Sequence, residues 1–232
     1  MSKVSGDIER LQRNLRDAKD ELKSLGLTTQ AQIEQLDVFA QTLAKWNKSF
    51  NFVSRQDMNR LVDRHLIDSL HANAWLTGTQ ILDVGSGAGL PGIPLAIARP
   101  ECHFVLLDRH ERRMRFVEQV SHQLGLENVT VIVQNLLDKQ WQADHRGKFD
   151  TVVSRAVLPP VELWEGCCNL LGTQGRMIAF YSTTKEQELE QKPDEQVPLT
   201  PLPAHFKVVT YEAGAVPGDG RAGRRLAIRQ VS

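Results

Sequence analysis

Apolar residues at alternating steps of three and four predict helices over the first third of the chain. One stripe consists of Ile8, Leu11, Leu15, Ala18, Leu22 and Leu25. Its spacing is that of one face of a helix, which Gly26 should end. Similar patterns cover residues 33–46 and 58–70, the latter following Ser54, a favourable N-cap residue. We therefore expect residues 1–76 to be helical.

Beyond Gly78 the pattern changes to short apolar runs that alternate with helical stretches. The expected strands are 81–84, 103–107, 129–133 and 151–153, and the expected helices are 91–98, 112–124 and 161–171. Such alternation is typical of right-handed crossover units, which build a mainly parallel sheet with helices on both faces. Further runs at 177–181, 206–211 and 226–228 would complete the sheet as edge strands. Residues 185–200 are expected to form a helix end and an exposed loop. The prediction is an α/β domain at 77–232 behind a helical cap at 1–76.

Composition narrows the possible partners. The chain has 28 Lys and Arg against 28 Asp and Glu, so nucleic acid would have to bind through local patches and not through bulk charge. The longest uncharged stretch, 84–98, is broken by glycine and proline and is too short for a membrane helix. The first residues lack a secretory signal, so we expect a cytoplasmic protein with no membrane partner. The three cysteines have no metal-ligand spacing, and no metal is expected.

A glycine loop follows the first predicted strand. Gly85, Gly87 and Gly89 come directly after the buried run 81–84, and Pro91 stands where a helix should begin. Glycine tolerates positive φ and has no Cβ to hold a ligand away, while free amides at a helix start favour polar groups. The loop therefore predicts a cofactor site at the carboxyl edge of the sheet.

Two cofactors compete for this loop. Residues 87–92 satisfy the dinucleotide pattern G-x-G-x-x-G, and Asp108 lies 21 residues beyond Gly87, near the spacing of the ribose-binding acid. However, the loop begins at Gly85, directly after Asp83 and Val84, and this phase resembles the first motif of class I S-adenosylmethionine-dependent methyltransferases. We favour S-adenosylmethionine over a dinucleotide. Asp108 ends the second strand and could accept both ribose hydroxyls or cap the next helix.

Several motifs in order resemble those of the ribosomal RNA small subunit methyltransferase G family. They are Trp46 to Phe52, Arg64 to Leu70, Gly85 to Pro94, Leu106 to Asp108 with Arg112 to Phe116, and Ser154 to Ala156. The resemblance covers about residues 33–181, with a looser match at 225–229. It implies a class I fold with a seven-stranded, mainly parallel sheet. It also implies methyl transfer from S-adenosylmethionine to N7 of a guanine in 16S ribosomal RNA, with small-subunit RNA or the 30S particle as partner. We expect a monomer.

The resemblance also assigns cofactor contacts. They are Asp83, Gly85, Gly87, Gly89, Leu90, Asp108, Leu136, Leu137 and Arg155. Two positions depart from the family pattern. Leu136 and Leu137 stand where the family has a small residue followed by Glu, with Asp138 one step late. Tyr181 and Ser182 replace a Lys and a small residue at the end of the fifth strand.

The expected chemistry needs no general base. Guanine N7 already carries an in-plane lone pair, so the protein need only hold donor and acceptor in line. We therefore assign no acid or base, and Arg155, His65 and Asp68 are candidates for positioning the substrate or for helix packing. No Asn-Pro-Pro or Asp-Pro-Pro motif of amino-group methyltransferases follows the fourth strand, and no Pro-Cys of pyrimidine-carbon methylation occurs. A non-catalytic RNA-binding protein of this fold and a nicotinamide-dependent oxidoreductase remain alternatives.

Two basic segments are candidates for contact with RNA phosphates. One comprises Arg109, Arg112, Arg113 and Arg115, and the other is the tail from Pro201 onward. Either could instead be a solvated surface. Trp46 and Phe50 fit a hydrophobic core better than a base-stacking platform.

Overall fold

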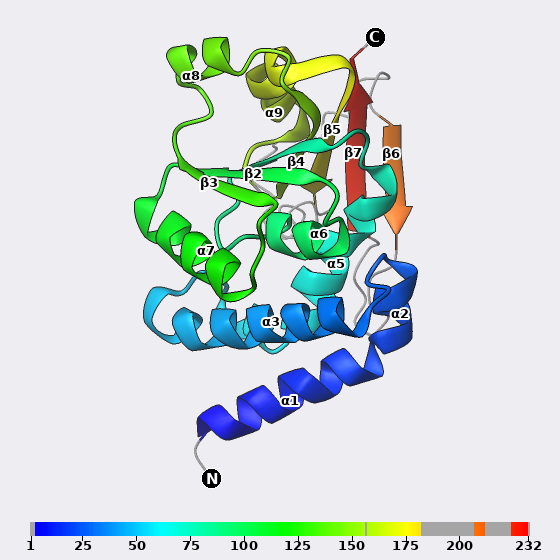
Figure 1. Cartoon of the computed structure of the whole chain (residues 1–232), viewed down its shortest axis with the longest axis vertical. Coiled ribbons are helices and arrows are strands. Elements are labelled where there is room, and N and C mark those ends of the chain that lie inside the picture. Colours follow the sequence, from blue (N-terminus) through cyan, green and yellow to red (C-terminus); the bar gives the residue numbers. More distant parts are fainter. Residues whose placement is uncertain (1–2, 156, 182–206, 212–223, 232) are drawn as a thin grey trace, which may run out of the picture.

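The computed structural model describes residues 3–155, 157–181, 207–211 and 224–231. Within them, a sheet with helices on both faces stands above a layer of N-terminal helices, and α1 lies outermost (Figure 1). The first helices are α1 (Lys3–Asp17), α2 (Lys19–Ser24) and α3 (Gln30–Phe50). The stripe expected as one helix over 8–25 is thus two helices, interrupted at Ala18, although Leu11, Leu15 and Leu22 are buried as its pattern predicts. None of the described helices has the length and apolarity of a membrane span.

Side chains define both ends of α3. The Thr29 hydroxyl accepts from the backbone N–H of Gln32, and the Gln32 side chain accepts from the backbone N–H of Thr29, forming a capping box. At the other end Asn51 adopts the left-handed conformation, with φ of 49°, which an L-residue other than glycine rarely takes. Gly26, with φ of 114°, follows α2 as its position in the sequence predicts.

The helix expected over 58–70 is irregular. The structure has α4 (Arg55–Met58), a π-helical turn η1 (Val62–Ile67), α5 (Asp68–Leu70) and a 3-10 turn η2 (His71–Trp75). Within it the Ser69 hydroxyl donates to the His65 carbonyl, a back-bond of the kind that bends helices. The spacing of apolar residues correctly predicted that Leu61, Leu66 and Leu70 are buried. It could not predict the type of helix, because it contains no information about a hydrogen bond from a side chain to the backbone.

Seven strands of the described chain form one sheet in the order β3-β2-β1-β4-β5-β7-β6. They are β1 (Gln80–Val84), β2 (His103–Asp108), β3 (Val129–Val133), β4 (Phe149–Arg155), β5 (Leu171–Tyr181), β6 (Lys207–Tyr211) and β7 (Arg224–Gln230). The first five pair in parallel, and β7 pairs antiparallel with both β5 and β6. The predicted mainly parallel sheet is confirmed. The expectation that the last three strands are edges is wrong, because of these three only β6 lies at an edge, and the other edge is β3.

The remaining helices connect the strands. They are α6 (Gly92–Ala98), α7 (Glu111–Gln123), α8 (Lys139–Asp144), α9 (Pro160–Cys167) and the 3-10 turn η3 (Cys168–Leu170). The pattern missed α8, and it placed the end of α9 too late: Leu171 already belongs to β5. That strand is longer than expected because residues 172–175 are inserted opposite Asp150, where the pairing of β4 with β5 shifts register. Residues 185–200 lie outside the described chain.

Alternation along the strands divides the core into two clusters. Ile81, Phe104 and Leu106 face the side where the N-terminal helices, α6 and α7 pack. Leu82 and Val84 face the opposite side, which α8 and α9 cover. Both faces of β1 and β2 are therefore buried along most of their length, and the strand ends are where polar groups can reach a ligand.

Asn47 closes the turn that follows α3. Its side-chain amide donates to the carbonyl of Val53 and accepts from the N–H of Val53, both at 2.8 Å, and Asn47 is 5% exposed. Replacing it would leave two buried backbone groups without partners. We expect Asn47→Ala to lower the free energy of unfolding by about 2–4 kcal/mol in urea denaturation. Ser49→Ala, at an exposed position of α3, should change it by less than about 0.5 kcal/mol. Equal stability of the two variants would contradict this role.

Candidate cofactor site

The glycine loop leaves β1 and is tied to the end of β2. The N–H groups of Gly85 and Ser86 both donate to the carbonyl of Leu107, at 2.7 and 3.0 Å. Gly85, Gly87 and Gly89 all have positive φ, at 67°, 57° and 79°. Each therefore occupies a backbone conformation that favours glycine. The loop thus lies at the carboxyl edge of the sheet, as the sequence predicted.

The three glycines have different surroundings. A Cβ on Gly85 would lie 2.1 Å from Cγ2 of Val157, and one on Gly89 would lie 2.6 Å from Cγ1 of Ile93. A Cβ on Gly87 would meet only the Gly85 carbonyl, at 3.8 Å. Gly85 and Gly89 therefore serve close packing within the protein. Gly87 alone faces open space, where a ligand could approach the backbone.

Asp83 supports the loop from beneath and is completely buried. Its Oδ2 accepts from the N–H of Gly92 at 2.9 Å, which joins the end of β1 to the start of α6. A Cβ on Gly92 would lie 2.6 Å from that same oxygen, so the contact requires glycine. Burial raises the pKa of Asp83 to about 7, although the Ser86 hydroxyl, the Gly92 amide and the Arg155 guanidinium oppose the shift. Asp83 therefore shapes the site without facing a ligand.

Asp108 bridges the glycine loop and the start of α7. Its Oδ2 accepts from the N–H of Gly87 at 3.0 Å. Its Oδ1 accepts from the backbone N–H of His110 at 2.8 Å and lies 2.7 Å from His110 Nδ1. A carboxylate has about four acceptor positions, so one remains for a ribose hydroxyl. The sequence suggested ribose binding and helix capping as roles that could coexist; in the structure the carboxylate binds the two backbone amides and keeps a position for the ribose.

Arg155, Asp68 and His65, three candidates for positioning the substrate, lie together in the structure. Nη1 of Arg155 lies 3.3 Å from Oδ2 of Asp68 and 3.4 Å from the carbonyl oxygen of His65. The ion pair is largely buried, with side-chain exposures of 14% and 8%. The guanidinium also lies 5.9 Å from the centre of the Phe180 ring. The irregular helical segment of the N-terminal layer is thus joined to the carboxyl end of β4.

Leu136 and Leu137 differ in exposure. Leu136 is buried in the core between the sheet, α8 and α9, whereas 61% of Leu137 is exposed. Asp138 accepts from the N–H of Trp141 at 2.8 Å and caps α8. It therefore does not stand in for the Glu of the family pattern. The second departure from the family pattern, at Tyr181 and Ser182, involves side chains that the structure does not describe.

Exposed apolar side chains mark the same edge of the sheet. Among described residues, the exposed large hydrophobics are Phe50, Val133, Leu137 and Val157. Val133 ends β3, Leu137 follows it, and Val157 follows β4 and faces Gly85. Apolar groups that remain exposed beside a polar loop are typical of a binding site. Sequence reasoning missed Val157 because only the fold shows that it lies against the loop.

Residues 32–210 match the protein family described as "GidB: rRNA small subunit methyltransferase G". The chain is 41% identical over 175 residues to "Ribosomal RNA small subunit methyltransferase G" of Shigella flexneri, covering 75% of this chain and 83% of that protein. The protein of the same name from Escherichia coli K12 shows the same identity and coverage.

Two solved structures share the fold. A methyltransferase from Geobacter sulfurreducens superposes with a TM-score of 0.54 at 18% identity, covering 82% of this chain and 87% of that one. A SAM-dependent methyltransferase from Aquifex aeolicus gives a TM-score of 0.50 at 13% identity, covering 74% and 93%. At these identities the likeness shows the fold alone.

The buried carboxyl of Asp83 predicts a pH-dependent stability. Because its pKa is raised to about 7, the folded protein retains this proton at a pH where the unfolded chain has lost it. Its contribution to stability is thus complete below pH 4 and is lost as pH rises to about 7. Asp83→Asn keeps an acceptor for Gly92 and cannot ionise. Its free energy of unfolding relative to the unmodified protein should rise between pH 4 and 7, by at most about 4 kcal/mol. If urea denaturation gives a difference in free energy of unfolding between the two proteins that stays constant from pH 4 to 7, the prediction is contradicted.

Proposed function

Because the chain belongs to the rRNA small subunit methyltransferase G family, we propose that it transfers a methyl group from S-adenosylmethionine to N7 of a guanine in 16S ribosomal RNA. The observation that carries the proposal is the match over residues 32–210, which includes the glycine loop, Asp108 and Arg155. With the domain bounds expected from the sequence, residues 77–232 would form the catalytic domain, and residues 1–76 would form the cap that shapes substrate entry.

The residues at the carboxyl edge of the sheet fit this cofactor. Gly87 leaves space beside a backbone segment, and Asp108 retains one acceptor position for a ribose hydroxyl. Val133 and Leu137 offer exposed apolar surface suited to a purine face. When bound, S-adenosylmethionine supplies an electrophilic methyl group on a sulfonium. Gly85, Gly89, Leu90 and Leu136 would act through the shape of the site, because they pack within the protein.

The protein has little proton chemistry to perform. The N7 lone pair forms the bond to the methyl carbon while the carbon–sulfur bond breaks toward sulfur, and no proton leaves the base. The task of the chain is therefore alignment, which can contribute several kcal/mol. Arg155, fixed by Asp68, and the neighbouring His65 would orient the guanine and not act as acid or base.

The arginines of α7 divide into two kinds. Arg113 lies 3.7 Å from Asp108 and therefore belongs to the cofactor site. Arg112 and Arg115 are exposed, and Arg115 pairs with Glu111 on the surface of the helix. We propose that Arg112 and Arg115 contact RNA phosphate. The second candidate, the tail from Pro201, lies mostly outside the described residues.

The decisive experiment is transfer of a tritiated methyl group to 30S particles from cells that lack this protein. Incorporation should be confined to one guanine, with mass mapping showing an N7-methyl product. Binding of S-adenosylmethionine without any incorporation would favour the non-catalytic alternative. Saturable NADH binding without S-adenosylmethionine binding would favour an oxidoreductase.

Asp108 should contribute directly to cofactor affinity. Asp108→Ala removes an acceptor from the ribose and releases the Gly87 amide, so S-adenosylmethionine binding should weaken by about 1–3 kcal/mol in isothermal titration. Asp150→Ala is the matched control. It also removes a carboxylate oxygen that binds two backbone amides, those of Thr79 and Gln80, but at the opposite edge of the sheet. Equal affinity of the two variants for the cofactor would show that Asp108 only shapes the loop.

Reversing the charges of Arg112 and Arg115 should weaken RNA binding. For Arg112→Glu with Arg115→Glu, the slope of log affinity against log salt should flatten by about 0.7–0.9 for each lost phosphate contact. S-adenosylmethionine affinity should be unchanged. The control is Arg146→Glu with Lys148→Glu, an equal reversal at exposed positions before β4. An identical salt slope in both double variants would place the RNA surface elsewhere.

A further inference from the structure

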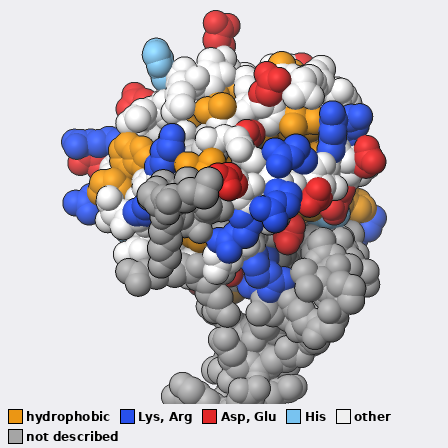
Figure 2. Space-filling view, turned by 90° about the horizontal axis from the view of Figure 1, so that it is seen from below, with side chains coloured by type: hydrophobic (Ala, Val, Ile, Leu, Met, Phe, Trp, Pro, Cys, Tyr) orange, Lys and Arg blue, Asp and Glu red, His pale blue; other side chains and the backbone are white. Residues whose placement is uncertain are grey.

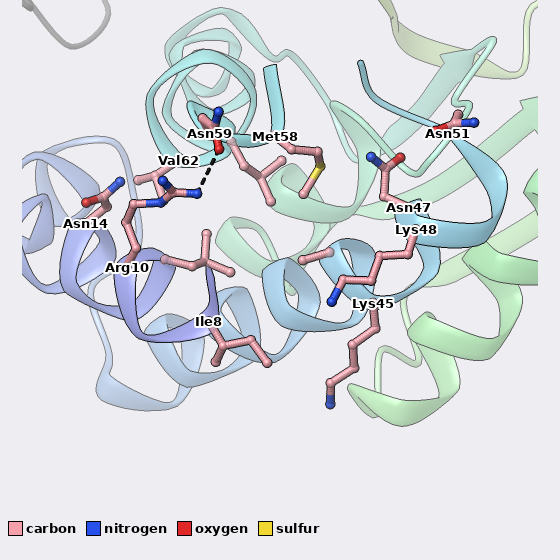
Figure 3. Close-up of a pocket in the computed structure, with 13 residues that line it drawn as sticks. Ile8, Arg10, Asn14, Lys45, Asn47, Lys48, Asn51, Met58, Asn59 and Val62 are labelled. Carbon is pink, nitrogen blue, oxygen red and sulfur yellow. Dashed lines mark hydrogen bonds between the residues drawn. The ribbon is translucent and has the colours of Figure 1, made fainter. Parts of the chain in front are cut away.

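A cavity of about 470 Å³ lies in the N-terminal layer, between α1, the last turns of α3 and residues 58–62. Figure 3 shows Ile8, Arg10 and Asn14 of α1 on one side and Lys45, Asn47 and Lys48 of α3 on the other. Its volume is within the range of about 300–1,000 Å³ that is usual for small-molecule sites. None of the residues of the glycine loop lines it, so it is separate from the cofactor site.

The lining combines an apolar floor with a cationic rim. Leu11, Ala44 and Leu61 are among the apolar residues that line it, and Leu11 and Leu61 are buried. The charged residues of the lining are Arg10, Lys45 and Lys48, with no carboxylate among them. No described carboxylate forms an ion pair with Lys45 or Lys48. A ligand that suits this lining has a flat apolar part and a negative charge.

The polar side chains of the cavity have distinct roles. Asn47 is occupied with Val53, as described above, and Arg10 donates to Oδ1 of Asn59 at 2.7 Å, which joins α1 to the 58–62 segment. Asn14 and Asn51 also line the cavity, and amides of this kind carry both donors and acceptors. This combination matches the edge of a nucleobase, while the cations match a phosphate.

Two contacts, linked through residues that are adjacent in sequence, connect this cavity with the cofactor edge. Asn51 lines the cavity and follows Phe50, whose exposed ring lies under the guanidinium of Arg112 at 5.4 Å. Arg112 neighbours Arg113, which contacts Asp108. Figure 2, seen from the side of the N-terminal helices, shows that Lys and Arg side chains gather near the centre of this face among scattered carboxylates. A single nucleic-acid strand could follow these groups from the cavity to the site of methyl transfer.

We propose that the cavity binds one nucleotide of the substrate RNA, away from the guanine that receives the methyl group. The base lies on the apolar floor beside Ala44, and its phosphate lies at the rim near Lys48 and Arg10. This inference rests on the proposed function, because it assumes an RNA substrate. It assigns the N-terminal layer a direct part in RNA binding.

Filling the cavity tests the proposal without changing charge. Ala44→Phe places a ring on the floor, and Ala31→Phe, at an exposed position of the same helix, is the matched control. We expect Ala44→Phe to raise KM for 30S particles about tenfold, since stacking is worth about 1–3 kcal/mol per base. Its kcat and its dissociation constant for S-adenosylmethionine should stay within twofold of the unmodified protein. Circular dichroism and urea denaturation must show that both variants are folded. If Ala44→Phe is not folded, Ala44→Gln replaces it.

Charge reversal tests the rim. Lys48→Glu should raise KM severalfold, whereas Lys23→Glu, an equal change on α2 outside the cavity, should not. A KM equal to that of its control for either cavity variant overturns the proposal, provided the unmodified protein methylates 30S particles. If the unmodified protein itself fails to methylate them, the proposed function has failed. GMP and inorganic phosphate are also titrated into the unmodified protein and into both cavity variants. If a cavity variant loses the GMP binding of the unmodified protein while its KM for 30S particles is unchanged, the cavity is a site for free nucleotides, and the proposal is overturned.

Discussion

The geometry of this protein depends on a buried carboxylate at the end of β1. Asp83 binds the amide at the start of α6, and burial raises its pKa to about 7. Its electrostatic partner is Arg155 at the end of β4, which is itself joined to Asp68 of the N-terminal layer. Strand, loop, helix and cap are thus connected through groups that would each be costly to bury alone. The arrangement orders the carboxyl edge of the sheet before any ligand binds.

This constraint predicts that the loop tolerates little substitution. Gly92 must lack a Cβ because Asp83 approaches it, and Gly85 and Gly89 must lack one because Val157 and Ile93 do. Only Gly87 is left for a ligand. The glycines of one motif therefore divide into those that serve packing and one that serves binding. Preorganisation of this kind is what a transfer reaction without proton exchange requires, since alignment is then the main contribution of the protein.

The sheet and its loop could be predicted from the sequence because their signals are local. Alternating apolar runs defined β1 to β4 within a residue or two. The phase of Gly85 relative to β1 predicted a methyltransferase and not a dinucleotide-binding protein, in agreement with the family match. The winding of η1 and the start of β5 could not be predicted. The first is associated with a hydrogen bond from Ser69 to a backbone carbonyl, and the second with a shift in strand pairing. Asp138 shows the same limit, because a carboxylate one position late proved to be a helix cap.

Charges illustrate why placement matters more than number in this chain. With 28 positive and 28 negative side chains, long-range attraction to RNA is weak, and affinity must come from local groups of cations. Of the arginines predicted as one patch, Arg113 and Arg115 face carboxylates, and Arg112 covers an aromatic ring. Lys48 belongs to the motif Trp46 to Phe52 but was assigned no role from the sequence, and Lys45 lies outside that motif; the fold places both cations beside a cavity. The sequence alone does not show this position, because the cavity forms only where α1 packs against α3, and the residues on its two sides are 30 or more positions apart. An RNA that contacts both the cavity and the carboxyl edge would be oriented by two distant points, which restricts its approach more than a uniform basic surface would.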